Sequence, residues 1–267
     1  MAKKLLVIVF ALIIVIFSAK VVLADYASDY QNYVNQGGAY QSAYGYYVRA
    51  RLNYLSSQSL DSQDKAMQAT ITMLVARDNY MSSYLTAIKT KMANTQGVNA
   101  TDQGLISNEL SSEIAWYATH SSKIPSAGSL SDLVADSDAA KTEYNGITLN
   151  IIYNSLITLG IGNNAYIRGE IENEITTLDA KIAEIKANQD KDTSTIERSV
   201  VDVQNKLDRS TGKDTDAKNL ISALKPSDSQ GTDSFTSAQS DLTDSNSYLK
   251  EANEQLLQII SQIKSAN

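Results

Sequence analysis

The sequence predicts an all-α protein made of elongated antiparallel helical hairpins, a coiled-coil bundle with about six helices after an N-terminal signal segment. Three observations support this fold class. The 267 residues include only two prolines and twelve glycines, so helix breakers are few. Several segments repeat apolar residues at alternating steps of four and three, the heptad spacing of helices that share a seam. Beyond the apolar run near the N-terminus, dense runs of β-branched and aromatic residues, which are typical of strands, do not occur.

The first element, residues 1–24, has the layout of a secretory signal peptide. Lys3 and Lys4 precede an apolar run from Leu5 to Phe17, and Val22 and Ala24 are small residues placed for a cut before Asp25. The alternative is an uncleaved anchor, because residues 5–23 are long enough to span a bilayer. The small-residue cut site favours cleavage. Either way, we expect the rest of the chain to be exported to the cell surface, the periplasm or the extracellular space.

Polar, glycine-containing and proline-containing breaks divide the rest of the chain into six expected helices. They are expected near 25–57, 60–94, 101–123, 129–159, 165–224 and 232–266. The segment 159–164, with the sequence LGIGNN, is one of the breaks, and the fifth helix is expected to bend or break near 188–195. Grouped by their patterns, the helices form a Tyr-rich N-terminal hairpin (25–94), a set of middle helices (95–164) and a long C-terminal coiled-coil hairpin (165–267).

The N-terminal hairpin carries two heptad seams. On the first helix the seam is expected at 26, 30, 33, 37, 40, 44, 47, 51 and 54, of which seven are tyrosines. On the second helix it runs through Met67, Ile71, Leu74, Asp78, Met81, Leu85, Ile88 and Met92. A turn near residue 59 would bring the seams face to face, with Tyr40 opposite Asp78. We therefore expect the Tyr40 hydroxyl to satisfy the only acid of this seam, as a polar layer that fixes the register.

The abundance of tyrosine has two interpretations. The seam interpretation is favoured, because a tyrosine ring buries apolar area while its hydroxyl reaches water at the edge of a thin two-helix interface. The alternative is an aromatic binding face. Tyr46, Tyr80 and Tyr84 lie off the expected seam and are therefore the candidate partner-binding residues. Seven tyrosines on one helix exceed what two helices need, which predicts a second layer from the middle helices or from another copy of the protein.

The C-terminal hairpin repeats the pattern with other residues. One seam holds Ile196, Val200, Val203, Leu207, Ser210, Asp214, Ala217, Ile221 and Leu224, and the other holds Phe235, Ala238, Leu242, Ser245, Leu249, Ala252, Leu256, Ile259 and Ile263. Opposed in antiparallel order, they alternate large and small residues, for example Leu207 against Ala252. Asp214 meets Ser245 in a second polar layer. Ile171, Ile175, Leu178, Ile182 and Ile185 extend a seam upstream.

Composition argues against several classes of function. There is no cysteine, so disulfides and thiol chemistry are excluded. Residues 1–24 hold three lysines and no acid, so the remainder carries 20 basic and 30 acidic residues, a poor match for nucleic acid. Membrane contact is expected only through residues 1–24, if they stay attached. We predict no catalytic residues, no cofactor and no metal. His120 is the only histidine, and its position fits the C-terminal end of a helix, where the helix dipole favours a basic side chain.

The chain resembles, in general pattern, the elongated helical bundles of exported bacterial proteins, although no family motif can be matched residue by residue. The expected function is that of an exported, non-enzymatic surface or envelope scaffold that contacts itself or another envelope protein through coiled-coil helices. The alternative is a ligand-binding or adhesin-like bundle that holds its partner on the Tyr-rich N-terminal hairpin.

Overall fold

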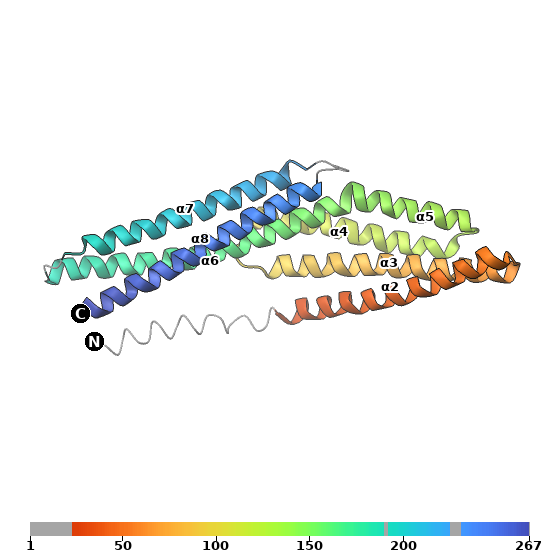
Figure 1. Ribbon diagram of the computed structural model, residues 1–267, viewed down its shortest axis with the longest axis horizontal. Coiled ribbons are helices and arrows are strands. Elements are labelled where there is room, and N and C mark those ends of the chain that lie inside the picture. The colour runs from red at the N-terminus through yellow and green to blue at the C-terminus, as the bar shows by residue number, and fades with distance from the viewer. Residues whose placement is uncertain (1–22, 190–191, 225–230, 267) are drawn as a thin grey trace. The chain divides into compact units, whose positions relative to one another are not determined.

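The computed structural model describes residues 23–189, 192–224 and 231–266, and this part of the chain is helical with no strand, which confirms the all-α class (Figure 1). Six helical segments account for it: α2 (Leu23–Ser57), α3 (Leu60–Asn94), α4 (Ala100–Lys123), the continuous pair α5 (Leu130–Glu143) and α6 (Leu149–Gln189), α7 (Ser194–Ser222) and α8 (Gly231–Ala266). The expected signal segment lies outside the described residues, apart from its last two residues at the start of α2.

The helix boundaries in the middle of the chain differ from the expectation. A π-helical turn, Tyr144–Thr148, joins α5 to α6, and α6 continues through the segment that was expected to be a break. Gly160 and Gly162 serve close packing instead of chain reversal. A Cβ atom on Gly160 would overlap the Leu242 side chain of α8, and one on Gly162 would overlap Val98. The chain reverses later, between Gln189 and Ser194, inside the segment where a bend or break was expected.

The chain divides into two compact units. The described residues of the first are 23–94 and Leu105–Tyr144, and the second comprises Thr95–Gly104 together with the described residues from Asn145 onward. The boundary falls at the π-helical turn on one side and within α4 on the other. The segment 95–164, expected as a separate set of middle helices, is therefore shared between the two units.

In the first unit, α2 and α3 lie antiparallel along their length (Figure 1). Thr90 donates a hydrogen bond to Asp29 at 2.6 Å near the open end, and Ser57 donates to Ser62 at 2.8 Å near the turn. These pairs agree with the expected reversal near residue 59. The alignment of the two helices along their axes was therefore predictable from the sequence.

The faces that meet agree with the expected ones only in part: the seam residues Tyr40 and Tyr47 are partly buried and pack against α3. On α2 the buried positions are Ala43 and Ala50, whereas Tyr30 and Tyr44, placed on the seam by the sequence pattern, are 49% and 50% exposed. Small alanines let the two helices approach closely, so the larger rings move to the side. There they rest against seam tyrosines: the Tyr44 and Tyr47 ring centroids are 6.1 Å apart.

On α3 the expected stripe is largely buried, and it faces other helices of the same unit as well as α2. Leu74 is 1% exposed and packs in a cluster with Ile124 and Leu133 from the segments that follow α4. The neighbouring face of α3, marked by Tyr80, also meets α2. The same cluster includes Ala43 of α2, so α3 is covered on two sides and the predicted stripe is shared between the hairpin and the segments after α4.

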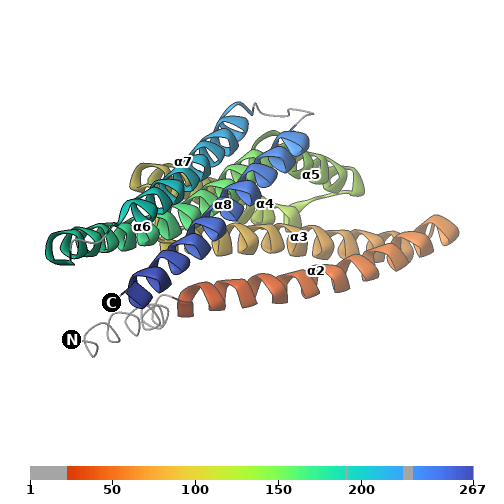
Figure 2. The same ribbon diagram turned by 60° about the vertical axis from the view of Figure 1, so that its left-hand side comes forward.

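The core of the second unit is formed by α6, α7 and α8 (Figure 2). Both predicted C-terminal stripes are buried or partly buried along α7 and α8. The isoleucines of α6 complete the core, so three helices share it where two were expected. The register also differs slightly. Ser210 was expected opposite Leu249 but bonds Ser245 at 2.8 Å, about one helical turn earlier along α8.

A glycine in the second unit gives a first prediction. Gly97 precedes α4 with φ of 79°, and a Cβ atom there would overlap the Gly162 carbonyl oxygen. Gly97→Ala should therefore lower the free energy of unfolding by at least about 1–2 kcal/mol. Gly104→Ala is the control, because that glycine lies within α4 with no atom within 4 Å of its added methyl group. Chemical denaturation should show it unchanged or stabilised by about 0.5–1 kcal/mol; equal losses in both variants would contradict the packing described.

Candidate interaction surface

The outward side of α2 carries a second apolar stripe, which we call the outer stripe. It consists of Tyr30, Val34, Gln41, Tyr44, Val48, Leu52 and Leu55. Its heptad-like steps are interrupted at Gly37, where an added Cβ atom would contact Tyr80 of α3. At 3.6 residues per turn these positions share one face, about 100° around the helix from the face that meets α3. Within it Val34 is 45% exposed, Leu52 57% and Leu55 53%. A heptad stripe on an exposed face is the pattern of a helix that packs against another helix.

The few charges on α2 strengthen this interpretation. Only four of its 35 residues are charged: Asp25, Asp29, Arg49 and Arg51. Exposed helices in water usually carry charged residues on their free face. The acids lie at the beginning of α2 and the arginines near its end, so the uncharged outer stripe runs between two oppositely charged ends.

Beneath the outer stripe lies a layer of stacked tyrosines between α2 and α3. The Tyr80 ring stacks on Tyr33, with centroids 5.0 Å apart, and on Tyr40, with centroids 6.1 Å apart. Tyr84 also contacts Tyr33, at 5.0 Å between centroids. Two of the three candidate partner-binding residues, Tyr80 and Tyr84, are thus half-buried within the hairpin. Tyr46, the third candidate, therefore does not form one exposed patch with them.

The tyrosine layer predicts an unusual alkaline titration. The Tyr33 and Tyr80 hydroxyls share a 3.0 Å hydrogen bond, which together with burial raises the pKa of Tyr33 from 10.0 to about 12. Since the folded protein holds this proton more tightly, the contribution to stability is present below pH 10 and is lost as the pH rises through 12. Burial also raises the pKa of Tyr84, so phenolate absorbance should show late-titrating tyrosines, one of which, Tyr33, titrates earlier in Tyr80→Phe. An unchanged late titration in that variant would contradict the assignment.

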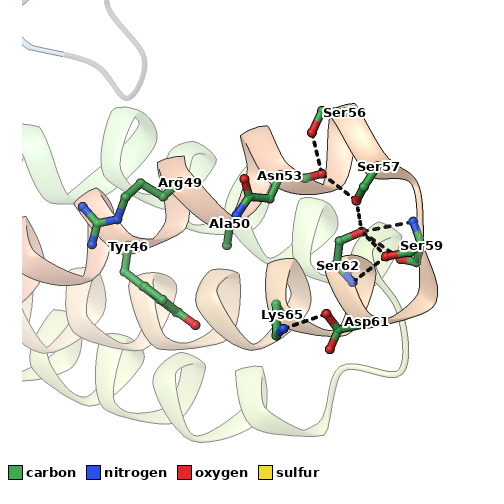
Figure 3. A pocket seen from close by; sticks show the side chains of 10 residues that line it. All are labelled: Tyr46, Arg49, Ala50, Asn53, Ser56, Ser57, Ser59, Asp61, Ser62 and Lys65. Carbon is green, nitrogen blue, oxygen red and sulfur yellow. Dashed lines mark hydrogen bonds and ion pairs between the residues drawn. The ribbon is translucent and has the colours of Figure 1, made fainter.

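Tyr46 lies near the tip of the hairpin, in a polar pocket of about 510 Å³ (Figure 3). It is 47% exposed. Arg49 and Asn53 line the pocket from α2, and Lys65 lines it from α3, where it is paired with Asp61 at 2.6 Å. The serines of the turn bond one another and Asn53, so they hold the tip together. Arg49 has no ion pair among the described residues, which leaves its guanidinium available at the edge of the pocket.

Asp78 is satisfied by a residue other than the expected Tyr40. Its carboxylate lies 2.5 Å from His120 Nδ1 and accepts a hydrogen bond from Arg77 at 3.1 Å. Asp78 is fully buried and His120 is 8% exposed. His120 does lie in the last turn of α4, as its sequence position indicated, but its ring is turned inward and stacked on Trp116 with centroids 4.8 Å apart. This hydrogen-bonded pair is a buried link that ties α3 to α4.

The second expected polar layer lies in the core of the second unit. Asn164 donates hydrogen bonds to Asp214 at 2.9 Å and to Ser245 at 3.1 Å, so both expected residues meet through a third one. Arg168 pairs with Asp214 and also donates to Ser210 at 2.9 Å. The polar layer therefore joins α6, α7 and α8. Asn164 was missed because it lies in the LGIGNN segment, which was expected to be a break between helices. Arg168 lies within the expected helix, but spacing gives no sign that its side chain reaches the core.

The outer stripe and the His120 link were also missed by the sequence interpretation. The stripe has a signal in the sequence, since Val34, Val48 and Leu52 follow the heptad steps that Tyr30 and Tyr44 begin. Assigning those two tyrosines to the hairpin seam concealed it. The His120 link has no local signal, because its partner lies 42 positions away on another helix.

The chain has no significant match among protein-family models, curated proteins or solved structures. Within the described residues, the helices are all too short or too polar to cross a membrane. The same part of the chain shows no cluster of three or more residues suited to hold a metal ion.

Proposed function

We propose that the protein is an exported, non-enzymatic helical scaffold of the cell surface or envelope, which works by packing its outer stripe against helices of other protein chains. The observation that carries the proposal is the exposed heptad stripe on α2, with Leu52 and Leu55 more than half exposed. Covering such a stripe with another helix removes apolar surface from water at about 25 cal/mol per Å². The stripe itself has no charged residue over about seven helical turns, so its surface is better matched to another helix than to water.

Export is proposed from the N-terminal sequence. The basic residues, the apolar run and the small-residue site before Asp25 support secretion with cleavage. Fractionation of source cells followed by N-terminal sequencing tests this part directly. We expect the protein outside the cytoplasm with Asp25 as its first residue. Recovery in the cytoplasm with residues 1–24 attached would contradict it.

The scaffold role is tested by changing the outer stripe alone. Tyr44→Ser and Leu52→Ser together should keep the helical circular dichroism spectrum and the melting temperature, because both side chains are exposed. The same pair should abolish recovery of protein partners from cross-linked source cells. The control is Leu105→Ser, an equally exposed leucine (59%) on α4 of the same unit. Partner recovery that survives the double change would contradict the proposal.

A second function is favoured by the pocket at the hairpin tip. A half-exposed ring beside free guanidinium and amide groups is suited to a sugar, whose C–H face stacks on tyrosine while its hydroxyl and carboxylate groups meet Arg49 and Asn53. A glycan array that includes uronic acids tests this function. Binding that is lost in Tyr46→Ser and Arg49→Ala, and kept in Tyr166→Ser, would support it; no binding to any glycan would dismiss it.

A further inference from the structure

The outer stripe is complementary to itself when it is reversed. With Gln41 placed opposite its own copy, an antiparallel second α2 brings Tyr30 opposite Leu52 and Val34 opposite Val48. Tyr44 then lies opposite Gly38, which has no neighbouring atom within 4 Å of a position for a Cβ. Tyr44 thus meets an open position, while the other two pairs bring apolar side chains together across the contact. From Tyr30 to Leu52 the matched length is about 33 Å at 1.5 Å per residue.

The charges of α2 favour the same arrangement. Asp25 and Asp29 lie in its first two turns, and Arg49 and Arg51 lie in its last turns. An antiparallel pair brings the acidic end of one α2 near the basic end of the other, whereas a parallel pair would bring like charges together. Asp25, Arg49 and Arg51 form no ion pair within the described residues, and Asp29 accepts a hydrogen bond from Thr90. The arginines are therefore free for contacts with a second chain.

We infer that the partner of the outer stripe is a second copy of this protein, paired antiparallel about a two-fold axis at Gln41. This inference rests on the proposed function and specifies its partner. The contact is isologous, so each copy uses the same surface and the pair is closed. Two α2 helices meet at the centre, and each α3 lies to the side of its own α2, about 100° around that helix from the contact. The tyrosines of α2 exceed in number what a two-helix hairpin needs. In this pair, the second copy provides the additional layer against which the exposed ones pack.

The absence of cysteine in the sequence allows a direct test of this geometry. The full chain is produced with single cysteines and oxidised by oxygen with a copper–phenanthroline catalyst. Gln41→Cys should give a disulfide-linked dimer in high yield, because residue 41 meets itself at the axis. Tyr30→Cys and Leu52→Cys should each give little dimer alone and abundant dimer when the two proteins are mixed. Val134→Cys, 60% exposed on α5 of the same unit, measures random collision.

The outcomes separate the arrangements. Dimer from each of the three positions alone would show parallel pairing and overturn the inference. No dimer above the Val134→Cys level, with light scattering that shows a monomer, would also overturn it. If the protein is a monomer but cross-linking in source cells still joins the outer stripe to a different protein, the proposed function holds and only the dimer is wrong. If no such protein is found, both are wrong. A supporting variant is Val34→Glu with Val48→Glu, which should keep the fold and convert the dimer to monomer.

Discussion

Replacing Val203 with aspartate should unfold the α6, α7 and α8 core at a much lower temperature than the unchanged protein. Val203 is fully buried, in a cluster with Leu207, Leu249 and the isoleucines of α6. A carboxylate there has no partner and loses its hydration, so we expect a loss of about 4 kcal/mol or more in the free energy of unfolding. Circular dichroism during thermal or urea denaturation measures it.

The matched control lies two residues away on the same helix. Val201 is 58% exposed, so Val201→Asp makes the same chemical change in water and should alter stability by no more than about 0.5 kcal/mol. The difference between the two variants isolates burial from helix propensity, which is the same for both. If both variants melted alike, α7 would not face the core with the stripe that contains Val203.

The second large effect concerns the buried link between α3 and α4. His120→Ala leaves the fully buried Asp78 carboxylate with Arg77 alone, and breaking a buried pair in this way costs about 3–5 kcal/mol. Removing the acid as well should not add to the loss, because the penalty comes from the charge left behind. Asp78→Ala combined with His120→Ala should therefore be at least as stable as His120→Ala.

Two measurements check this prediction. Urea denaturation of the two single variants and the double variant gives the coupling free energy between the residues. Fluorescence of Trp116, the only tryptophan, reports the local effect because its ring stacks on His120. Losses that simply add in the double variant would show that Asp78 and His120 act independently, against the 2.5 Å contact.

The C-terminal stripes show what periodicity can establish. Each of α7 and α8 faces its core with one stripe, so apolar spacing alone identified the buried residues correctly, from Val200 to Ile263. The sequence pattern could not show that a third helix shares that core. Gly160 and Gly162 indicated a break between two helices, so the pattern did not show α6 as one long helix. In the structure, these glycines allow Leu242 and Val98 to pack closely against α6.

The N-terminal hairpin shows the limit of the same reasoning. α2 and α3 each carry two apolar stripes, and spacing does not say which stripe meets which helix. Tyrosine is the more conspicuous residue, so the pattern favoured Tyr30 and Tyr44 for the seam, while the close contact uses Ala43 and Ala50. A tyrosine ring is too large for a close two-helix contact at those positions. The long-range partners of Asp78 could not be predicted either, because they depend on how α4 folds back.

We propose that the outer stripe of α2 is covered by another protein chain in the cell. The most direct test is cross-linking of intact source cells with a membrane-impermeant lysine reagent, followed by mass spectrometry of every peptide joined to this chain. Lys65 and Lys91 flank α2 from α3 and report on its neighbours. We expect reproducible links from these lysines to another chain, including a second copy of this one. Links confined to single molecules would contradict it.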